Sequence, residues 1–226
     1  MTTSPILVLA IDIEMSGPRF KEHDILAIGS VVMNENFEVL DIFFVKNYNP
    51  DDVNFEEKCW TEFWTKDGKT VLKELKINSK LTKSDREKNM IYEFMNFVHK
   101  WEILSKDKKY KLDIVSDNPS YDIGTGINSL IEKYLPECTK TLIYDSDGNF
   151  RIIRDTDSII KGILIMIDPK FVSENDWGYT KKIRELYNVP KITIEHNHLP
   201  HNDAYNIAFD YQITVGIMKN KIKLRD

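Results

Sequence analysis

Two carboxylates lie close together in an apolar stretch near the start of the sequence, VLAIDIEMSG (residues 8–17). Side chains of an extended strand alternate between its two faces, so Asp12 and Glu14 would share one face. Carboxylates at this spacing repel each other, and burying either is costly unless a cation or several hydrogen-bond donors compensate. The stretch contains no lysine or arginine. We therefore expect its positive partner, a cation or a set of donors, to come from outside the strand.

A second pair of acidic residues follows a later apolar stretch, in SDNPSYDIG (residues 116–124). Asp117 and Asp122 are both candidates for a charged site. The alternative is a structural role, because aspartate is common at turns and helix starts, where it accepts backbone hydrogen bonds. The residues alone leave both candidates and both roles open.

The third acidic position is Asp203, in EHNHLPHNDAYNIAFDYQITVGIM (residues 195–218). From this point apolar residues recur at helical spacing and form one stripe, made of Ala204, Ile207, Ala208, Tyr211 and Val215. Asp203 precedes the stripe on the same side, so its side chain should face the protein at the positive end of the helix. It could simply stabilise that helix end. Three histidines within six residues, His196, His198 and His201, favour a functional site instead.

Apolar segments of strand length come first in the chain, and segments of helical periodicity follow and alternate with later strands. We expect strands at 6–14, 25–33, 37–45 and 112–116, a hairpin at 141–153, and helices from Ser84 and over 123–135, 157–167, 177–188 and about 202–219. The helix from Ser84 begins with SDRE, a capping box, and SKDKKYK after it is expected to be a loop. Short, turn-rich links between the first three strands indicate an antiparallel meander. The sequence predicts an α/β fold with a mixed sheet flanked by helices.

Composition is that of an ordinary globular domain, with 226 residues, 42% hydrophobic, 30% charged and a net charge of −5. The negative charge argues against binding nucleic acid by overall attraction, but not against local basic patches. Cys59 and Cys138 lack CxxC spacing, so we expect reduced thiols and a cytoplasmic, intracellular setting. The N-terminus has no signal-peptide pattern. No apolar run approaches the roughly 20 residues that span a bilayer, so no membrane association is expected.

The acidic motifs, taken together, resemble those of the DEDDh family of 3′–5′ exonucleases, which have a ribonuclease H-like fold. The family's Asp-x-Glu motif matches Asp12 and Glu14, and the wording IDIEMSG is closest to the oligoribonuclease branch. The EKCWTEFW segment is similar to phage exonuclease A-like members. The family's aromatic–Asp motif matches Tyr121–Asp122, and this match selects Asp122 over Asp117.

The third family motif, a histidine followed after four residues by aspartate, matches His198 and Asp203. His196 and His201 have a different spacing, and we expect them to serve only loop packing or solvent contact. The resemblance extends over about residues 6–218. It implies a single exonuclease domain over 1–226.

The sequence also departs from the family pattern. Pro18 stands where the family often has leucine, and a hairpin at about 138–153 has the character of an insertion. Both differences leave the branch, and therefore the substrate length preference, undetermined.

The resemblance implies a two-metal site that hydrolyses phosphodiester bonds. Its ligands would be the motif carboxylates Asp12, Glu14, Asp122 and Asp203, with Asp12 bridging. Oxygen-only ligands favour two Mg²⁺ or Mn²⁺ ions over zinc. His198 would accept the proton of the attacking water.

The implied partner is the 3′ end of single-stranded RNA or DNA, shortened to nucleoside 5′-monophosphates. The backbone of Met15, Ser16 and Gly17 would contact the terminal nucleotide. A homodimer is compatible with the resemblance, because oligoribonuclease and ribonuclease T are dimers.

Three alternatives remain at this stage. A zinc hydrolase could use His196, His198 and His201, although no second metal-ligand cluster accompanies them. A ribonuclease H-like module could bind nucleic acid or a protein without catalysis, although such relatives usually lose an acidic residue. A polymerase proofreading subunit ranks below a free-standing nuclease, because little sequence follows the last helix.

Basic and aromatic residues could supplement a nucleic-acid site. The candidates are Lys66, Lys69, Lys73, Lys76, Lys181, Lys182 and Arg184 for the strand and Trp60, Phe63 and Trp64 for its bases. Charge runs are more often solvated faces, and aromatic residues at helical spacing are more often part of a core.

Overall fold

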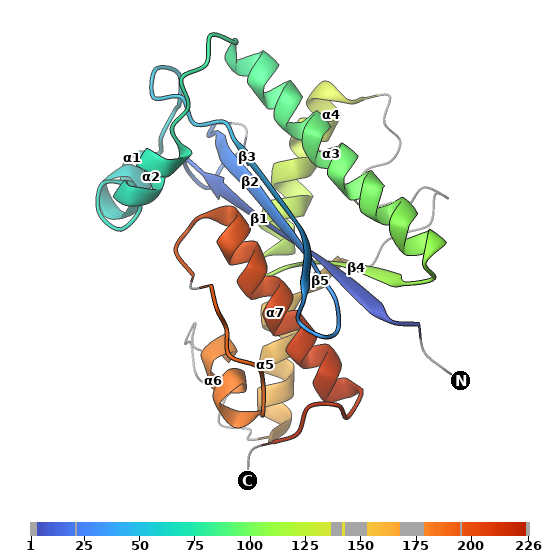
Figure 1. Ribbon diagram of the computed structural model, residues 1–226. Helices are drawn as coiled ribbons and strands as arrows, with labels where there is room; N and C mark the ends of the chain where they lie inside the picture. The colour runs from blue at the N-terminus through green and yellow to red at the C-terminus, as the bar shows by residue number, and fades with distance from the viewer. Residues whose placement is uncertain are drawn as a thin grey trace.

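Five strands form one mixed sheet in the computed structural model, which describes residues 4–20, 22–136, 142, 153–167, 179–194 and 196–224. The strands are β1 (Ile6–Met15), β2 (Ile25–Met33), β3 (Val39–Lys46), β4 (Lys111–Ser116) and β5 (Ile153–Asp155). Their order is β3-β2-β1-β4-β5, with antiparallel pairs on one side of β1 and parallel pairs on the other (Figure 1). The predicted α/β fold, with a meander followed by parallel strands, is confirmed.

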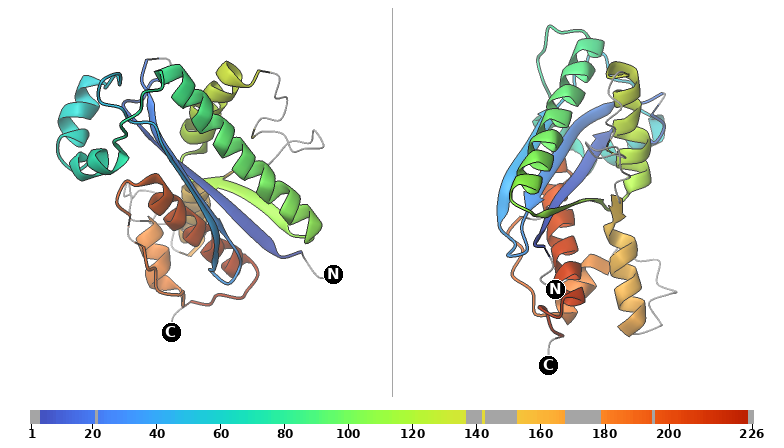
Figure 2. Two further views of the ribbon diagram at one scale, coloured as in Figure 1. Left: turned by 45° about the horizontal axis from the view of Figure 1, so that its top comes forward. Right: turned by 90° about the vertical axis from the view of Figure 1, so that its right-hand side faces the viewer.

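Helices cover both faces of this sheet (Figure 2). One face carries α3 (Lys83–Asp107) and α4 (Asn128–Tyr134), and the other carries α5 (Thr156–Ile167), α6 (Tyr179–Leu186) and α7 (Pro200–Met218). Beyond the end of the meander lie α1 (Glu57–Cys59), the π-helical segment η1 (Trp60–Trp64) and α2 (Lys69–Leu75). A second π-helical segment, η2 (Ser120–Ile127), follows β4 and leads directly into α4.

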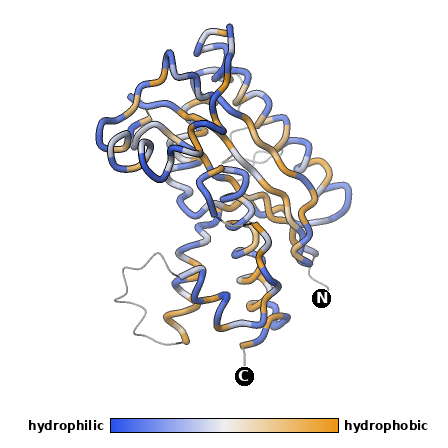
Figure 3. Tube along the Cα trace, turned by 60° about the vertical axis from the view of Figure 1, so that its left-hand side comes forward, coloured by the Kyte–Doolittle hydropathy of each residue, from blue (hydrophilic) through white to orange (hydrophobic). Residues whose placement is uncertain are grey.

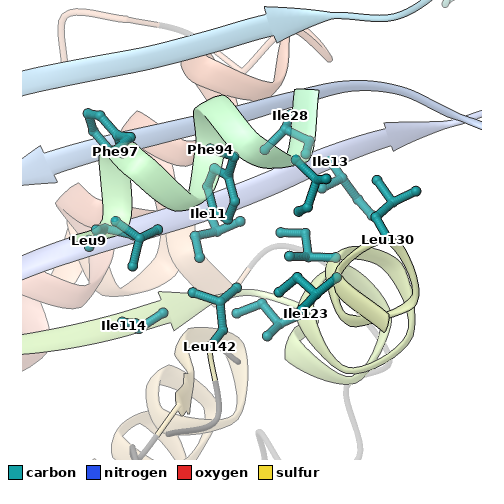
Figure 4. Packing of buried hydrophobic residues seen from close by; sticks show 14 of the residues in the cluster. Leu9, Ile11, Ile13, Ile28, Phe94, Phe97, Ile114, Ile123, Leu130 and Leu142 are labelled. Carbon is teal, nitrogen blue, oxygen red and sulfur yellow. The ribbon is translucent and has the colours of Figure 1, made fainter. Parts of the chain in front are cut away.

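The alternation of β1 divides the core into two layers. Leu9, Ile11 and Ile13 pack with Phe94 of α3 in one cluster (Figure 4). The intervening residues of β1 pack against α7 in the other cluster. Apolar residues accordingly run along the central strands, while hydrophilic stretches lie over the outer turns (Figure 3). Since Asp12 and Glu14 are spaced by two from Ala10 of the second layer, both carboxylates point to the side of α7.

The pairing of β1 exposes its acidic end. β1 pairs with β4 in parallel only as far as Ala10, which lies opposite Val115. On the other side the pairing with β2 continues past Asp12, opposite Gly29, to Glu14, opposite Ala27. The two carboxylates therefore lie beyond the end of the pairing with β4, and only β2 pairs with β1 beside them.

Several element boundaries differ from those predicted. The long helix is capped by Thr82, whose hydroxyl accepts from the Asp85 amide, so the expected cap at Ser84 is wrong. The same helix continues to Asp107, so the loop SKDKKYK is shorter than expected. The segment predicted as one helix over 123–135 begins earlier and is π-helical up to Ile127.

The long C-terminal helix α7 is buried more completely than one stripe requires. Every residue from 207 to 216 is buried, because the sheet covers one side of the helix and α5 the other. Its polar side chains are bonded inside: Gln212 donates to the carbonyl of Met33, and Asp210 accepts from Arg184.

Some predictions lie outside the described residues. These are the body of the expected hairpin insertion at 138–153, apart from Leu142 and Ile153, and Cys138. Among the helices that the structure does describe, none combines the length and apolar character needed to cross a bilayer.

Candidate active site

The first two acidic residues occupy adjacent positions on the α7 face of β1. Asp12 and Glu14 are each half-buried, since β2 and α7 cover them from one side only. The Oδ2 atom of Asp12 is buried, and within the described part of the chain it has no hydrogen-bond partner. A buried carboxylate oxygen without a donor is costly, and it fits a place where a cation binds.

The approach of α7 to the sheet depends on Gly29 of β2. A Cβ atom at this position would lie 2.1 Å from the backbone nitrogen of His201 and 2.1 Å from the carbonyl carbon of Pro200. Only glycine allows two backbones to come this close. Because Gly29 pairs with Asp12, this contact delivers the first turn of α7 to the first carboxylate.

Asp203 lies in that first turn and is only 5% exposed. Its Oδ1 atom accepts from the backbone amide of Asn197 at 3.2 Å and lies 2.9 Å from Nδ1 of His196. The helix N-terminus also favours a negative charge here. The residue is thus held at the sheet from three directions: its own helix, the preceding loop and a histidine.

Asp122 enters from the opposite side, on η2. Its side chain is 3% exposed and accepts a hydrogen bond from the hydroxyl of Ser116, the last residue of β4. The neighbouring Tyr121 packs on Phe20, with ring centroids 5.0 Å apart, and donates to the carbonyl of Gly17 at 3.3 Å. The end of β4 and the η2 turn therefore fix the position of this carboxylate.

Two overlapping sets of oxygen ligands result. One contains Asp12, Glu14 and Asp203, and the other contains Asp12, Asp117 and Asp122, with the ligand atoms of each set within 4.8 Å of one another. The four motif carboxylates are therefore brought together, and Asp12 belongs to both sets. Asp117, which the motif comparison set aside, also joins them. The only sequence signal for Asp117 was its position directly after a strand.

The carboxylates of this cluster are close together and largely buried, so their ionised forms are destabilised unless positive charge is nearby. Burial, followed by the charges of the neighbouring carboxylates, raises the pKa of Asp12 and of Glu14 well above the usual range. Burial raises the pKa of Asp122 to about 8 despite the hydrogen bond from Ser116, and the charge of Asp117 adds to the rise. Divalent cations would relieve this repulsion, and a donor set made only of oxygen suits Mg²⁺ or Mn²⁺.

The three histidines separate into different environments. His198, at a left-handed φ of 59°, has its ring centroid 4.5 Å from that of His196 and 4.8 Å from that of Phe63 in η1. His201 instead packs on Phe44, with centroids 4.2 Å apart. The donor atoms of His196, His198 and Asp203 lie within 4.8 Å of one another. The three-histidine set considered from the sequence is therefore wrong, because among the described residues Asp203 takes the place of His201.

His196 is the residue whose placement the sequence misjudged. Loop packing or solvent contact was expected, but its ring contacts the carboxylate of Asp203. This hydrogen bond raises the pKa of His196, whereas burial, together with the nearby His196, lowers the pKa of His198. No spacing rule linked His196 to Asp203, because their contact depends on the conformation of the loop between them, in which His198 has a left-handed backbone.

The segment after Glu14 is anchored by its own protein contacts. The carbonyls of Met15, Ser16 and Gly17 accept from Trp64 Nε1 at 3.1 Å, the Glu56 amide at 3.0 Å and the Tyr121 hydroxyl at 3.3 Å, respectively. The Ser16 hydroxyl is buried and donates to the carbonyl of Asn54 at 2.5 Å. A nucleotide that contacts this segment would have to use backbone groups other than these three hydrogen-bonded carbonyls.

The basic and aromatic residues considered for nucleic-acid binding differ in their exposure to solvent. Trp64 is 2% exposed and belongs to the core, so base stacking by Trp64 is wrong, whereas Trp60 is 39% exposed. Arg184 forms a two-point ion pair with the buried Asp210, with both contacts at 2.6 Å. Its guanidinium therefore links α6 to α7, which is not the nucleic-acid contact considered from the sequence. The remaining lysine candidates, Lys66, Lys69, Lys73, Lys76, Lys181 and Lys182, include an exposed set on and around α2.

Similar proteins are found by comparing the structure and not by comparing the sequence. No protein-family model matches the sequence, and the comparison with curated proteins gives no match either. Among solved structures, the chain is similar to the nuclease domain of 3'hExo, a DEDDh family member solved bound to rAMP. The identity is 13%, the coverage is 99% of this chain and 96% of that chain, and the TM-score is 0.53.

A second solved structure, a full-length 3'-exonuclease, is 14% identical over 98% of this chain and 86% of its own, with a TM-score of 0.50. At these identities the likeness concerns the fold, and both proteins that share it are described as nucleases. The chain thus has the predicted ribonuclease H-like fold, which it shares with the nuclease domain of 3'hExo.

Proposed function

We propose that this protein is a DEDDh-type 3′–5′ exonuclease that depends on two divalent metal ions and releases nucleoside 5′-monophosphates from single-stranded RNA or DNA. The observation that carries the proposal is the position of Asp12, which belongs to both oxygen-only ligand sets at the end of the central strand. The shared fold with a DEDDh nuclease domain supports the same conclusion.

The metal ions would be held by Asp12, Glu14 and Asp203 on one side and by Asp12 and Asp122 on the other. Asp117 could add a ligand to the second set. When bound, Mg²⁺ or Mn²⁺ would supply the positive charge that activates water and stabilises the departing 3′ oxygen.

The protein's own contribution to the chemistry is a positioned base. His198 stands over the acidic cluster with its ring against Phe63, and its lowered pKa keeps the imidazole neutral near pH 7. A neutral ring nitrogen of His198 can accept the proton of the attacking water. Phe63 is half-buried beside this histidine, and we propose that it contacts a terminal base.

The strand leading to the site would meet the basic surface of α2. Lys69 and Lys73 are exposed one helical turn apart and follow the aromatic residues of η1. They provide positive charge for phosphates beside an otherwise acidic site.

The decisive assay uses 5′-labelled single-stranded RNA and DNA, short and long, with Mg²⁺ or Mn²⁺. We expect stepwise shortening from the 3′ end, block of the reaction by a 3′-phosphate, and 5′-monophosphates as the products. Internal cleavage of a circular single strand would contradict the exonuclease. Absence of hydrolysis of any strand with either metal would favour a non-catalytic nucleic-acid-binding module.

A further inference from the structure

The loop before α7 contains a donor set of a different chemistry from the oxygen-only sets. It combines two imidazoles, His196 and His198, with the carboxylate of Asp203, and the three donor atoms lie within 4.8 Å of one another. Nδ1 of His196 is already 2.9 Å from Oδ1 of Asp203, and the two imidazole planes are inclined at 73°. The three donor atoms are therefore close enough together to contact one ion.

Such a set discriminates between metals. Magnesium prefers oxygen ligands and holds its water tightly, whereas zinc binds imidazole nitrogen and carboxylate oxygen in four-coordinate sites with three protein ligands and one open position. For mixed nitrogen and oxygen donors, affinity is also higher for zinc than for manganese. Two imidazoles and one carboxylate match the zinc pattern.

The loop holds these donors in place without a metal. His198 adopts a left-handed backbone conformation, and the edge of its ring meets the Phe63 ring. Between the histidines, the Asn197 amide donates to Asp203, and the Asn197 side chain accepts from the Leu199 amide at 3.2 Å and from Asn202 at 3.0 Å. The side chain of His196 is 59% exposed, which gives an ion access from solvent.

We propose that His196, His198 and Asp203 form a zinc-binding site, which shares Asp203 with one of the two magnesium or manganese positions, and that zinc bound there inhibits the nuclease. The inhibitory half of this inference rests on the proposed function, and the binding half does not. Zinc would occupy the ring nitrogen of His198 that must accept a proton, and it would draw Asp203 out of its oxygen-only set. His196 adds zinc selectivity because it supplies an imidazole nitrogen. In the proposed hydrolysis it binds no metal and accepts no proton, and it serves only to hold Asp203.

The binding test measures zinc affinity by calorimetry in the presence of excess Mg²⁺. It compares the wild-type chain with His196→Ala and with the control His99→Ala. His99 is a matched control because it also pairs with a carboxylate, Glu102 at 3.7 Å, and is half-exposed, but it lies on α3 away from the cluster. We expect His196→Ala to weaken zinc binding at least about tenfold, by analogy with losses at metal-site partners. Equal zinc affinity in all three proteins would overturn the site.

The activity test follows Mg²⁺-dependent hydrolysis against increasing zinc, with each protein normalised to its own zinc-free rate. Wild type and His99→Ala should be inhibited at zinc concentrations at which His196→Ala is not, with a separation of at least about tenfold. Identical inhibition curves for wild type and His196→Ala would refute the inhibitory role, and hydrolysis that requires zinc would refute it too. His196-dependent zinc binding in a protein that degrades no strand would support the site and refute the proposed function instead.

Discussion

The two histidines beside Asp203 have opposite protonation tendencies, although their rings touch. His196 gains a proton more readily because Asp203 accepts its hydrogen bond, and its pKa is raised. His198 loses its proton more readily because it is partly buried and faces His196, and its pKa is lowered. Of these two residues, His198 is therefore the one whose neutral form, which can accept a proton, is favoured, while His196 holds the carboxylate of Asp203.

His198→Ala tests this assignment. We expect a loss of about 10²–10⁴-fold in turnover at neutral pH, the usual contribution of a positioned base, with Mn²⁺ affinity largely retained. The deficit should narrow at higher pH, where hydroxide replaces the missing base. A pH–rate profile under saturating Mn²⁺ measures the deficit, with His201→Ala, in the first turn of α7, as the control. A rate close to wild type at pH 7 would show that His198 is not the base.

Asp117 and Asp122 offer a second test at single residues. Both belong to one ligand set, but Asp122 is buried and fixed by Ser116, whereas Asp117 is exposed. We expect Asp122→Asn to abolish most turnover and to weaken Mn²⁺ binding more than Asp117→Asn. Calorimetric Mn²⁺ titration and single-strand hydrolysis of both variants give the comparison. If Asp117→Asn is the more damaging change, the choice of the second motif residue is wrong.

At the scale of elements, the site depends on how closely α7 approaches β2. Gly29→Ala would force a methyl group into the backbone at residues 200–201, where no side chain can move aside. Overpacking of this kind typically costs about 1–3 kcal/mol, and the shift of α7 should also separate Asp203 from Asp12. We expect a lower melting temperature together with weaker Mn²⁺ binding and a large loss of turnover.

Gly162→Ala is the matched control for that change. Gly162 lies inside α5, and an added Cβ atom there meets nothing within 4 Å. Alanine in a helix interior is favoured over glycine by roughly 0.5–1 kcal/mol, so this variant should be slightly more stable and fully active. Thermal denaturation and hydrolysis are measured for Gly29→Ala and Gly162→Ala in parallel. Equal melting temperatures and rates of the two variants would show that α7 does not depend on glycine at position 29.

Elements whose formation depends on the local sequence could be predicted, and those that depend on contacts between distant segments could not. The strands and long helices were predictable because alternation and helical periodicity are present in the sequence itself, and the Asp12–Glu14 pair was recognisable from its unusual place in an apolar strand. The contact of His196 with Asp203 was not predictable, since it depends on the conformation of a loop in which the Asn197 side chain accepts from Leu199 and Asn202. The π-helical form of η2 was not predicted either.

At the scale of the whole molecule, the acidic cluster opposes the stability of the fold. A carboxyl group whose pKa is higher in the folded than in the unfolded chain contributes stability below its unfolded pKa of about 4. That contribution is lost as the pH rises through the folded pKa, which for Asp122 is about 8. Asp12 and Glu14, whose pKa values are also raised, act in the same direction.

In EDTA, the melting temperature should therefore fall as the pH rises from about 5 to about 8. Adding Mn²⁺ at the upper end should restore it, because a ligand that binds only the folded state stabilises by about 2.7 kcal/mol at a hundredfold excess over its Kd. Scanning calorimetry across this pH range, with Asp122→Asn as a comparison of shallower pH dependence, measures both effects. A flat profile in EDTA would contradict the proposed mutual repulsion.

The buried Trp64 gives the molecule one more property. Its indole donates to the carbonyl of Met15, the residue directly after Glu14, and it is almost fully shielded from solvent. The emission of a shielded indole responds to nearby charge and to small displacements of its hydrogen-bond acceptor. Because the Trp64 indole is hydrogen-bonded to the end of the acidic strand, we expect its fluorescence to change when metal ions bind there, which would report binding without a label or a substrate.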